Sequence, residues 1–385
     1  MLNHLVDWLL SLGLHIPGAR LINYLSFRAM LAAVISMLIA FFAGGAIIRK
    51  LQRAQIGEEI RDLGLEGQMQ KKGTPTMGGV IIIAALLGSA LLVCRLDSIY
   101  TLLLIGTTIW CGAIGFADDY IKVFKHNKEG MSERGKLILQ FGLGLFVALT
   151  VCLSPSISTE RLVTTIPFVK AHEFDYSWLS PFRGQLGVYC SWGIYMVMII
   201  LVTLACSNGT NLTDGMDGLA TGTSAIVGVA LGIIAWLSGD ALNAHYLNIM
   251  HIPGAGEVAI YMAAFVGALL GFLWYNTFPA QVFMGDTGSL TIGGVIGVSA
   301  VLIRKELLLP ILCGIFLMES LSVIIQRTYF KHTRKKYGEG RRVFLMAPLH
   351  HHSQKKGIPE PRIVTRFWII GIILAVSTLA LLKVR

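Results

Sequence analysis

The sequence predicts an all-α, polytopic membrane protein built from about ten transmembrane helices. Three observations lead to this fold class: an apolar composition, long runs without charge, and basic residues concentrated in certain connections. Of the 385 residues, 54% are hydrophobic and only 14% are charged, whereas about a quarter of the residues in soluble domains are charged. We therefore expect residues 1–385 to form a single integral membrane domain.

Ten apolar runs approach the length of about 20 residues that a helix needs to cross a bilayer. The stretches 98–117, 186–206 and 258–285 contain no Asp, Glu, Lys or Arg. The predicted spans are residues 26–48, 76–94, 99–117, 136–153, 187–207, 218–238, 257–275, 287–303, 306–326 and 365–383. The eighth run is short and rich in glycine, and residues 327–364 form a basic loop before the last span.

Lysine and arginine determine the predicted orientation. They are dense in the connections that follow the first, third and ninth spans, and absent from those that follow the fifth and seventh. Because basic loops stay in the cytoplasm, the three basic connections are predicted to be cytoplasmic. Successive connections alternate between the two sides, so every connection after an odd-numbered span lies on that side and both termini lie outside. The net charge of +10 then reflects orientation in a membrane, and no nucleic-acid partner is expected.

Two adjacent aspartates, Asp118 and Asp119, stand where the third predicted span meets the cytoplasm. Adjacent carboxylates at a membrane boundary repel each other and lose hydration, so a cation, protonation or water must compensate. Lys122 lies four residues beyond Asp118 and shares a face with it on a continuing helix. The alternative is an ordinary solvated helix end.

The loop NGTNLTDGMDG, residues 208–218, is rich in polar residues and glycine. Asp214 and Asp217 are three residues apart, which allows them to share a helix face. Asn and Asp offer hard oxygen ligands or hydrogen bonds to a sugar or base, and Gly permits close backbone approach. The same residue types are also typical of turns and helix caps.

Asp286 follows a long uncharged stretch in the motif FMGDTGSL. Its place before Thr287 and Ser289 is typical of a helix start. There it is either a capping residue or a Mg²⁺ ligand beside a helix N-terminus that favours phosphate.

Three consecutive histidines, His350 to His352, lie in the basic loop within APLHHHSQKKG. They have no Cys or acidic partner at metal-ligand spacing. Because Lys355 and Lys356 are nearby, an anionic ligand is favoured over a transition metal. The lysines of KKGTPTMGG, residues 71–79, either contact phosphate or anchor the second span.

Glu319 is a carboxylate inside the ninth predicted span. An ionisable group inside a membrane span is often functional. The alternative is a structural carboxylate that is protonated or paired with a polar group in the bundle. The acidic loops and the histidine loop all fall on one predicted side. They can therefore build one site, acidic at its floor and basic at its rim, which suits a metal-bound diphosphate.

Five motifs together resemble the polyprenyl-phosphate N-acetylhexosamine-1-phosphate transferase superfamily. The aspartate pair with Lys122, NLTDGMDGL and FMGDTGSL carry the resemblance to the superfamily. KKGTPTMGG and APLHHHSQKKG are similar to the branch that uses muramoyl-pentapeptide donors. The resemblance covers residues 24–385, with one departure: the stretch 331–342 is longer and more basic than is usual in the family.

The resemblance implies a ten-span, often dimeric protein of the bacterial cytoplasmic (inner) membrane, with a cytoplasmic active-site cleft. The implied reaction moves phospho-N-acetylmuramoyl-pentapeptide from its UDP derivative to undecaprenyl phosphate, a membrane lipid, and yields lipid I and UMP for peptidoglycan synthesis. Asp286 matches the Mg²⁺ ligand of the family, and Asp118 and Asp119 match its essential acidic pair. Further positions that match catalytic or substrate-binding residues are Lys72, Lys122, Lys136, Asn211, Asp214, Asp217, Asn276, Phe283, His350, His351 and His352.

The predicted chemistry is Mg²⁺-assisted phosphoryl transfer by direct attack of the lipid phosphate. Asp118 deprotonates or orients that phosphate, and Lys122 balances charge. A covalent phospho-sugar intermediate on an aspartate is the alternative chemistry. The alternative functions are a related transferase that uses UDP-N-acetylglucosamine and, more distantly, a secondary transporter.

Overall fold

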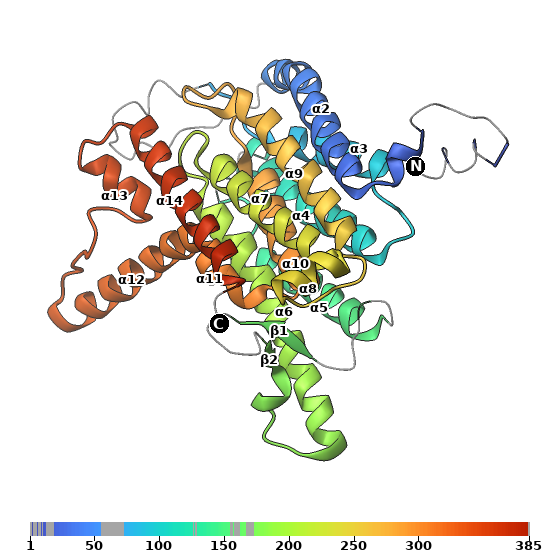
Figure 1. Cartoon of the computed structure of the whole chain (residues 1–385). Helices are drawn as coiled ribbons and strands as arrows, with labels where there is room; N and C mark the ends of the chain where they lie inside the picture. The colour runs from blue at the N-terminus through green and yellow to red at the C-terminus, as the bar shows by residue number, and fades with distance from the viewer. Residues whose placement is uncertain are drawn as a thin grey trace.

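The structure is a computed structural model that describes residues 19–54, 73–125, 129–154, 162–166 and 173–383, with isolated positions 2, 6, 9, 11, 12, 127 and 157. These residues are mostly helical, with one small sheet (Figure 1). In chain order the elements are η1 (Ala19–Asn23), α2 (Leu25–Arg53), α3 (Gly79–Val93), α4 (Ile99–Phe124), α5 (Glu133–Leu153), β1 (Val163–Thr165), β2 (Glu173–Asp175), η3 (Tyr176–Leu179), α6 (Gly184–Thr213), α7 (Leu219–Gly239), α8 (Ala241–Leu247), α9 (Ala255–Asn276), α10 (Gly285–Leu302), η4 (Glu306–Leu308), α11 (Leu309–Leu312), α12 (Gly314–Tyr337), α13 (Leu349–Lys355) and α14 (Glu360–Leu381).

The prediction of an all-α polytopic membrane protein is confirmed. Among the described residues, eight helices are long and apolar enough to cross a membrane, namely α2, α4, α5, α6, α7, α9, α10 and α14. The bent pair Glu306–Leu312 and Gly314–Tyr337 makes a ninth candidate. Helix α3 coincides with the second predicted span but has 15 residues, which is short for a crossing.

The ninth predicted span, 306–326, is not one straight helix. It breaks near Cys313, and the two pieces differ in direction by 77°. Helix α12 then continues beyond the predicted end to Tyr337 and stops at Gly338, which has φ +80°. Figure 1 shows α12 extending away from the helical bundle. The hydropathy pattern missed this extension because its last turns are basic, a composition that still favours a helix C-terminus.

Helix α10 lies at the centre of the bundle. All of its residues from Thr287 to Leu302 are buried. Glycines allow this packing: a Cβ on Gly79 of α3 would overlap the backbone of Gly288, and one on Gly293 would overlap the carbonyl group of Cys206 in α6. Small residues of this kind let helix backbones approach closely inside a membrane.

The end of the bundle away from Asp286 contains the sheet, in which β1 pairs antiparallel with β2. Two charged side chains are buried beneath it, a feature that the sequence did not indicate. Lys305 Nζ donates to Thr165 Oγ1 at 2.6 Å, and Glu306 Oε1 accepts from Tyr176 OH at 2.9 Å. Burial lowers the pKa of Lys305 to about 8.

A buried ion pair joins three helices at the same end. Arg28 of α2 donates to both carboxylate oxygens of Glu257 in α9, at 2.6 and 2.8 Å. It also donates to the carbonyl oxygen of Val93, the last residue of α3. Glu319 is therefore one of several buried carboxylates in the bundle.

Candidate active site

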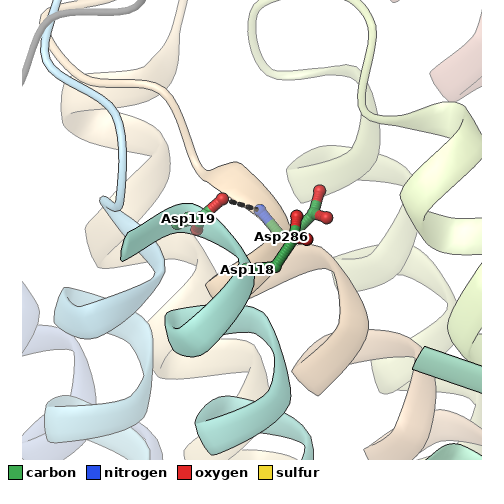
Figure 2. Close-up of side chains that lie close together, drawn as sticks. All are labelled: Asp118, Asp119 and Asp286. Carbon is green, nitrogen blue, oxygen red and sulfur yellow. Dashed lines mark hydrogen bonds between the residues drawn. The ribbon is translucent and has the colours of Figure 1, made fainter. Parts of the chain in front are cut away.

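Three aspartates from two helices meet at one end of the bundle (Figure 2). Asp118 and Asp119 lie in the last two turns of α4, which continues past its predicted end at 117, and Asp286 lies in the first turn of α10. One carboxylate oxygen from each lies within 4.8 Å of the others. A Cβ on Gly115 of α4 would overlap the carbonyl oxygen of Asp286, so the absence of a side chain there lets the two helices meet.

Asp119 caps the start of α10. Its Oδ1 accepts from the backbone N–H of Asp286 at 3.1 Å, the bond drawn in Figure 2. Its Oδ2 accepts from the backbone N–H of Thr287 at 2.9 Å and from the hydroxyl of Thr287 at 2.6 Å. The first N–H groups of a helix have no partner within the helix. Asp119 satisfies two of them and thereby fixes the backbone that carries Asp286.

Two lysines bridge the other two carboxylates. Lys122 Nζ lies 2.7 Å from Asp118 Oδ2 and 3.2 Å from Asp286 Oδ2. Lys136 Nζ, from the first turn of α5, lies 2.8 and 2.7 Å from the same two oxygens. Asp118 Oδ1 accepts from the N–H of Met131 at 2.7 Å, which ties the α4–α5 connection to the site.

Asn211 completes the surroundings of Asp286. It lies in the last turn of α6, and its Nδ2 donates to Asp286 Oδ1 at 2.8 Å and to Ser289 Oγ at 2.9 Å. Among the described residues, Lys122, Lys136 and Asn211 thus hold this carboxylate from three helices other than α10.

A divalent cation fits this donor set. Carboxylate oxygens are the ligands that Mg²⁺ prefers, and it is usually held by one or two of them together with phosphate oxygens. Three carboxylates against two ammonium groups leave a net negative charge in a desolvated site. Asp286 is the most accessible of the three aspartates, with 14% of its side chain exposed, and Asp118 shares both lysines with it. In the described part of the chain, this aspartate group is the cluster of three metal-ligating side chains.

The predicted polar loop, residues 208–218, is helical as far as Thr213, where α6 ends, and only the rest forms the connection to α7. Asp214 is half-buried, whereas Asp217 and Asn276 are 4% and 3% exposed. Asp217 Oδ2 accepts from the N–H of Ala280. Asn276 accepts from the backbone of Gly218 and donates to the carbonyl oxygen of Val282. Asp217 and Asn276 thus fasten the α6–α7 and α9–α10 connections to each other.

Phe283 lies beside the segment that contains the KKGTPTMGG motif. Its N–H donates to the carbonyl oxygen of Pro75, and its carbonyl oxygen accepts from the N–H of Gly78, both at 2.8 Å. The phenyl side chain is half-buried. Lys72, predicted to bind substrate, lies outside the described residues.

The three histidines of α13 have different surroundings. His350 is fully buried, with Nδ1 3.2 Å from Glu319 Oε2. His351 lies beside Gln354. His352 accepts from the N–H of Leu345 through Nδ1, and partial burial together with Lys356 lowers its pKa. These contacts favour separate roles for the three rings over one shared ligand.

Comparison with known proteins places the chain in a family. Residues 101–304, more than half of the chain, match the family described as glycosyl transferase family 4, and residues 71–83 match phospho-N-acetylmuramoyl-pentapeptide-transferase signature 1. A Parabacteroides distasonis protein named phospho-N-acetylmuramoyl-pentapeptide-transferase is 54% identical over 421 aligned positions, which cover 100% of both chains. The chain belongs to the phospho-N-acetylmuramoyl-pentapeptide-transferase family. Family members from Flavobacterium psychrophilum and Porphyromonas gingivalis bear the same name, at 52% and 51% identity over 96% and 100% of each chain.

In this member of the phospho-N-acetylmuramoyl-pentapeptide-transferase family, the structure adds three residues to the candidate site that the sequence motifs did not assign to it. Ser289 and Met131 contact Asn211 and Asp118. Glu360, which begins α14, accepts from the N–H of Asp217. No local pattern marks these residues, because each contacts a partner that is distant in sequence or contributes only a backbone group.

Proposed function

We propose that the protein transfers phospho-N-acetylmuramoyl-pentapeptide from UDP-N-acetylmuramoyl-pentapeptide to undecaprenyl phosphate, forming lipid I and UMP. The observation that carries this proposal is the convergence of three aspartates and two lysines at one end of a membrane bundle, in a chain of the transferase family. A soluble nucleotide-sugar and a lipid-anchored acceptor meet where an aqueous face adjoins the bilayer. A site at the ends of α4, α5, α6 and α10 meets that requirement.

Mg²⁺ is the proposed cofactor, with Asp286 as its principal ligand and Asp118 beside it. A diphosphate adds negative charge to a site that is already negative, so a divalent cation is needed for the substrate to bind. When bound, Mg²⁺ would neutralise the diphosphate and stabilise UMP as the leaving group.

The contacts of Asp118 support an orienting role for this residue rather than a role as base. It is buried, one oxygen accepts from Met131, and the other lies against both ammonium groups. Asp118 thus holds Lys122 and Lys136 beside Asp286, where they balance the charge of the phosphates. Positioning and charge balance are the main contributions of a protein to phosphoryl transfer.

Direct attack by the lipid phosphate is supported by the burial of the aspartate pair. A nucleophilic carboxylate needs an oxygen aimed at phosphorus, whereas Asp118 and Asp119 are 0% and 3% exposed and engaged with other groups. In the direct reaction, a lipid phosphate oxygen bonds to the β-phosphorus while the bond from that phosphorus to UMP breaks. Incubation with the nucleotide-sugar alone should release no UMP. A stoichiometric burst of UMP with a phosphorylated aspartate would overturn direct attack.

Nucleotide-sugar contacts are assigned to half-buried side chains near the aspartates, namely Asp214, Phe283 and His351. Asn211, Asp217, Asn276 and His350 are proposed to shape the same site from behind through their bonds to the protein. Lys72 is proposed to bind substrate because it matches a family position. The chain is further proposed to form a homodimer, which light scattering of the purified protein tests.

We place the protein in the bacterial cytoplasmic membrane with the site in the cytoplasm and both termini outside. The concentration of Lys and Arg in the connections that follow the first, third and ninth predicted spans supports this orientation. A cysteine introduced at exposed Lys336 should be protected from a membrane-impermeant thiol reagent in intact cells. Labelling of that cysteine in intact cells would contradict the orientation.

One assay tests the reaction. Purified protein in detergent receives Mg²⁺, undecaprenyl phosphate and either UDP-N-acetylmuramoyl-pentapeptide or UDP-N-acetylglucosamine, and UMP release is measured. We expect UMP and lipid I with the muramoyl-pentapeptide donor. Release with UDP-N-acetylglucosamine alone would assign the chain to a different donor, and release with neither donor would overturn the transferase proposal.

A further inference from the structure

Glu319 and His350 form a buried pair, with 0% and 1% of their side chains exposed. Glu319 belongs to α12, and His350 belongs to α13, after the connection that follows α12. Glu319 Oε2 lies 3.2 Å from His350 Nδ1 and accepts from the N–H of Leu349 at 2.7 Å. One carboxylate oxygen therefore contacts the imidazole ring and accepts a hydrogen bond from the backbone at the start of α13.

The other side of the imidazole meets the loop between α6 and α7. A Cβ on Gly215 would overlap His350 Nε2 and lie 2.9 Å from Cε1. Gly215 has a negative φ, which any L-residue can adopt, so the backbone itself does not require glycine at this position. The ring does require it, because a side chain at residue 215 would occupy the same space.

The last turn of α6 ties this loop to the aspartate site on one side, and Asp217 ties it to the α9–α10 connection and to α14 on the other. Asn211, four residues before Gly215, donates to Asp286. Asp217, two residues after Gly215, accepts from Ala280 and donates to Glu360 through its N–H. A displacement of Gly215 is therefore transmitted to the amide that orients Asp286 and to the half-buried side chain of Asp214.

Packing alone does not explain a buried carboxylate and imidazole at this position. Burying such groups is costly, and apolar side chains of similar volume commonly replace a buried charged pair without loss of stability. Glu319 Oε1 and both ring nitrogens of His350 find no hydrogen-bond partner among the described residues, so the ring is held by close contact between Glu319 and Gly215. What the pair provides is a fixed ring orientation against Gly215.

We infer that Glu319 is a positioning residue for this site, which acts through His350 to hold the loop that carries Asp214 and Asp217. The inference rests on the proposed transferase function and gives a role to a carboxylate that the sequence left unassigned. Glu319 does not touch the substrate in this account. Its effect reaches the reaction through the imidazole and the loop.

The first experiment compares Glu319→Ala and Glu319→Gln with wild type. We expect Glu319→Ala to lower kcat/KM for the nucleotide-sugar by roughly ten- to a hundredfold, because small misplacements of reacting groups have effects of this size. Glu319→Gln should lose less, since its amide oxygen can still accept from Leu349. The matched control is Ser320→Ala, the next residue in α12, whose hydroxyl donates to Phe316 in its own helix and whose loss should leave the rate unchanged.

The second experiment uses Gly215→Ala to test whether Glu319 acts on the loop through His350. Its methyl group must displace the imidazole, so the single variant should resemble Glu319→Ala. In the double variant the ring is no longer held by α12 and can move away from the methyl group. The combined loss should therefore not exceed the larger single loss, as expected for residues that act in series. Losses that multiply would overturn the inference.

Hydrogen–deuterium exchange of residues 208–218, which comprise the end of α6 and the loop that follows it, provides a readout that needs no turnover. Glu319→Ala should raise exchange in this loop, whereas Ser320→Ala should not. Unchanged exchange together with wild-type kinetics in Glu319→Ala would overturn the positioning role. If wild type releases no UMP, the transferase proposal fails, while the exchange data still decide whether Glu319 holds the loop.

Discussion

Replacement of Asp119 by asparagine separates a capping role from metal binding at the centre of the site. The substitution preserves volume but replaces one of the two carboxylate oxygens by an NH₂ group. Both oxygens accept hydrogen bonds: Oδ1 one from Asp286, and Oδ2 two from Thr287. If the amide oxygen of the variant takes the place of Oδ2, it keeps both hydrogen bonds from Thr287. The NH₂ group then faces the N–H of Asp286, and the hydrogen bond from that N–H is lost.

The expected cost follows from the lost bond. A hydrogen bond to a charged group contributes about 1.5–3 kcal/mol, and 1.4 kcal/mol corresponds to a tenfold change in rate. Because the lost bond is at the backbone of Asp286, we expect kcat to fall roughly ten- to a hundredfold. The Mg²⁺ concentration for half-maximal rate should stay within about twofold of wild type, since in this account Asp119 orients the ligand and does not bind the metal.

UMP release measured across a series of Mg²⁺ concentrations tests this reasoning. Thr291→Val is the matched control, because Thr291 is buried in α10 and its hydroxyl donates to Thr287 within the helix. Its activity should be close to that of wild type. An Asp119→Asn enzyme that needs much more Mg²⁺, and recovers its rate at high Mg²⁺, would refute the capping role and make Asp119 a ligand.

Three further predictions concern α5, the metal and the opposite end of the bundle. Gln140→Leu should lower kcat/KM about tenfold in the UMP assay, because buried Gln140 fixes α5 to α6 one turn beyond Lys136; Thr150→Val in the same helix should not, and equal effects would contradict this. Chelation of divalent cations should abolish turnover of wild type and renewed Mg²⁺ should restore it, whereas Asp286→Asn should stay inactive; activity that survives chelation would contradict a metal role. Burial lowers the pKa of Lys305 to about 8 from an ordinary value near 10.4, so the native state binds fewer protons than the unfolded state between these values and its stability should rise with pH across that window. In thermal unfolding measured across this pH range, Lys305→Met should lack this rise in stability. The same pH dependence in wild type and in Lys305→Met would contradict the role of Lys305.

The membrane helices were predictable because their physical cause is local. Each of the ten apolar runs coincides with helical structure. The apolar sequences of α6 and α9, for example, predict membrane helices without any knowledge of tertiary contacts. The ends were less predictable. Asp118, Asp119 and Lys122 interrupt the hydropathy pattern, yet α4 continues through them to Phe124 because partners from other helices compensate their charge.

The composition of the candidate site was predictable from its motifs, but the division of work within it was not. Spacing alone relates Asp118 to Lys122, whereas the contact of Lys136 with Asp286 depends on how α5 docks beside α10. The burial of His350 depends on Gly215, 135 positions earlier in the chain. Contacts of this kind are set by packing, which no short pattern in the sequence records.

The packing of α10 determines whether a large group can pass along this helix. Over the described part of the chain, side chains fill the space around Thr287 to Leu302, and protein interiors are packed as densely as organic crystals. A bulky polar group beside Asp286 would therefore find no route along α10 through the described part of the bundle.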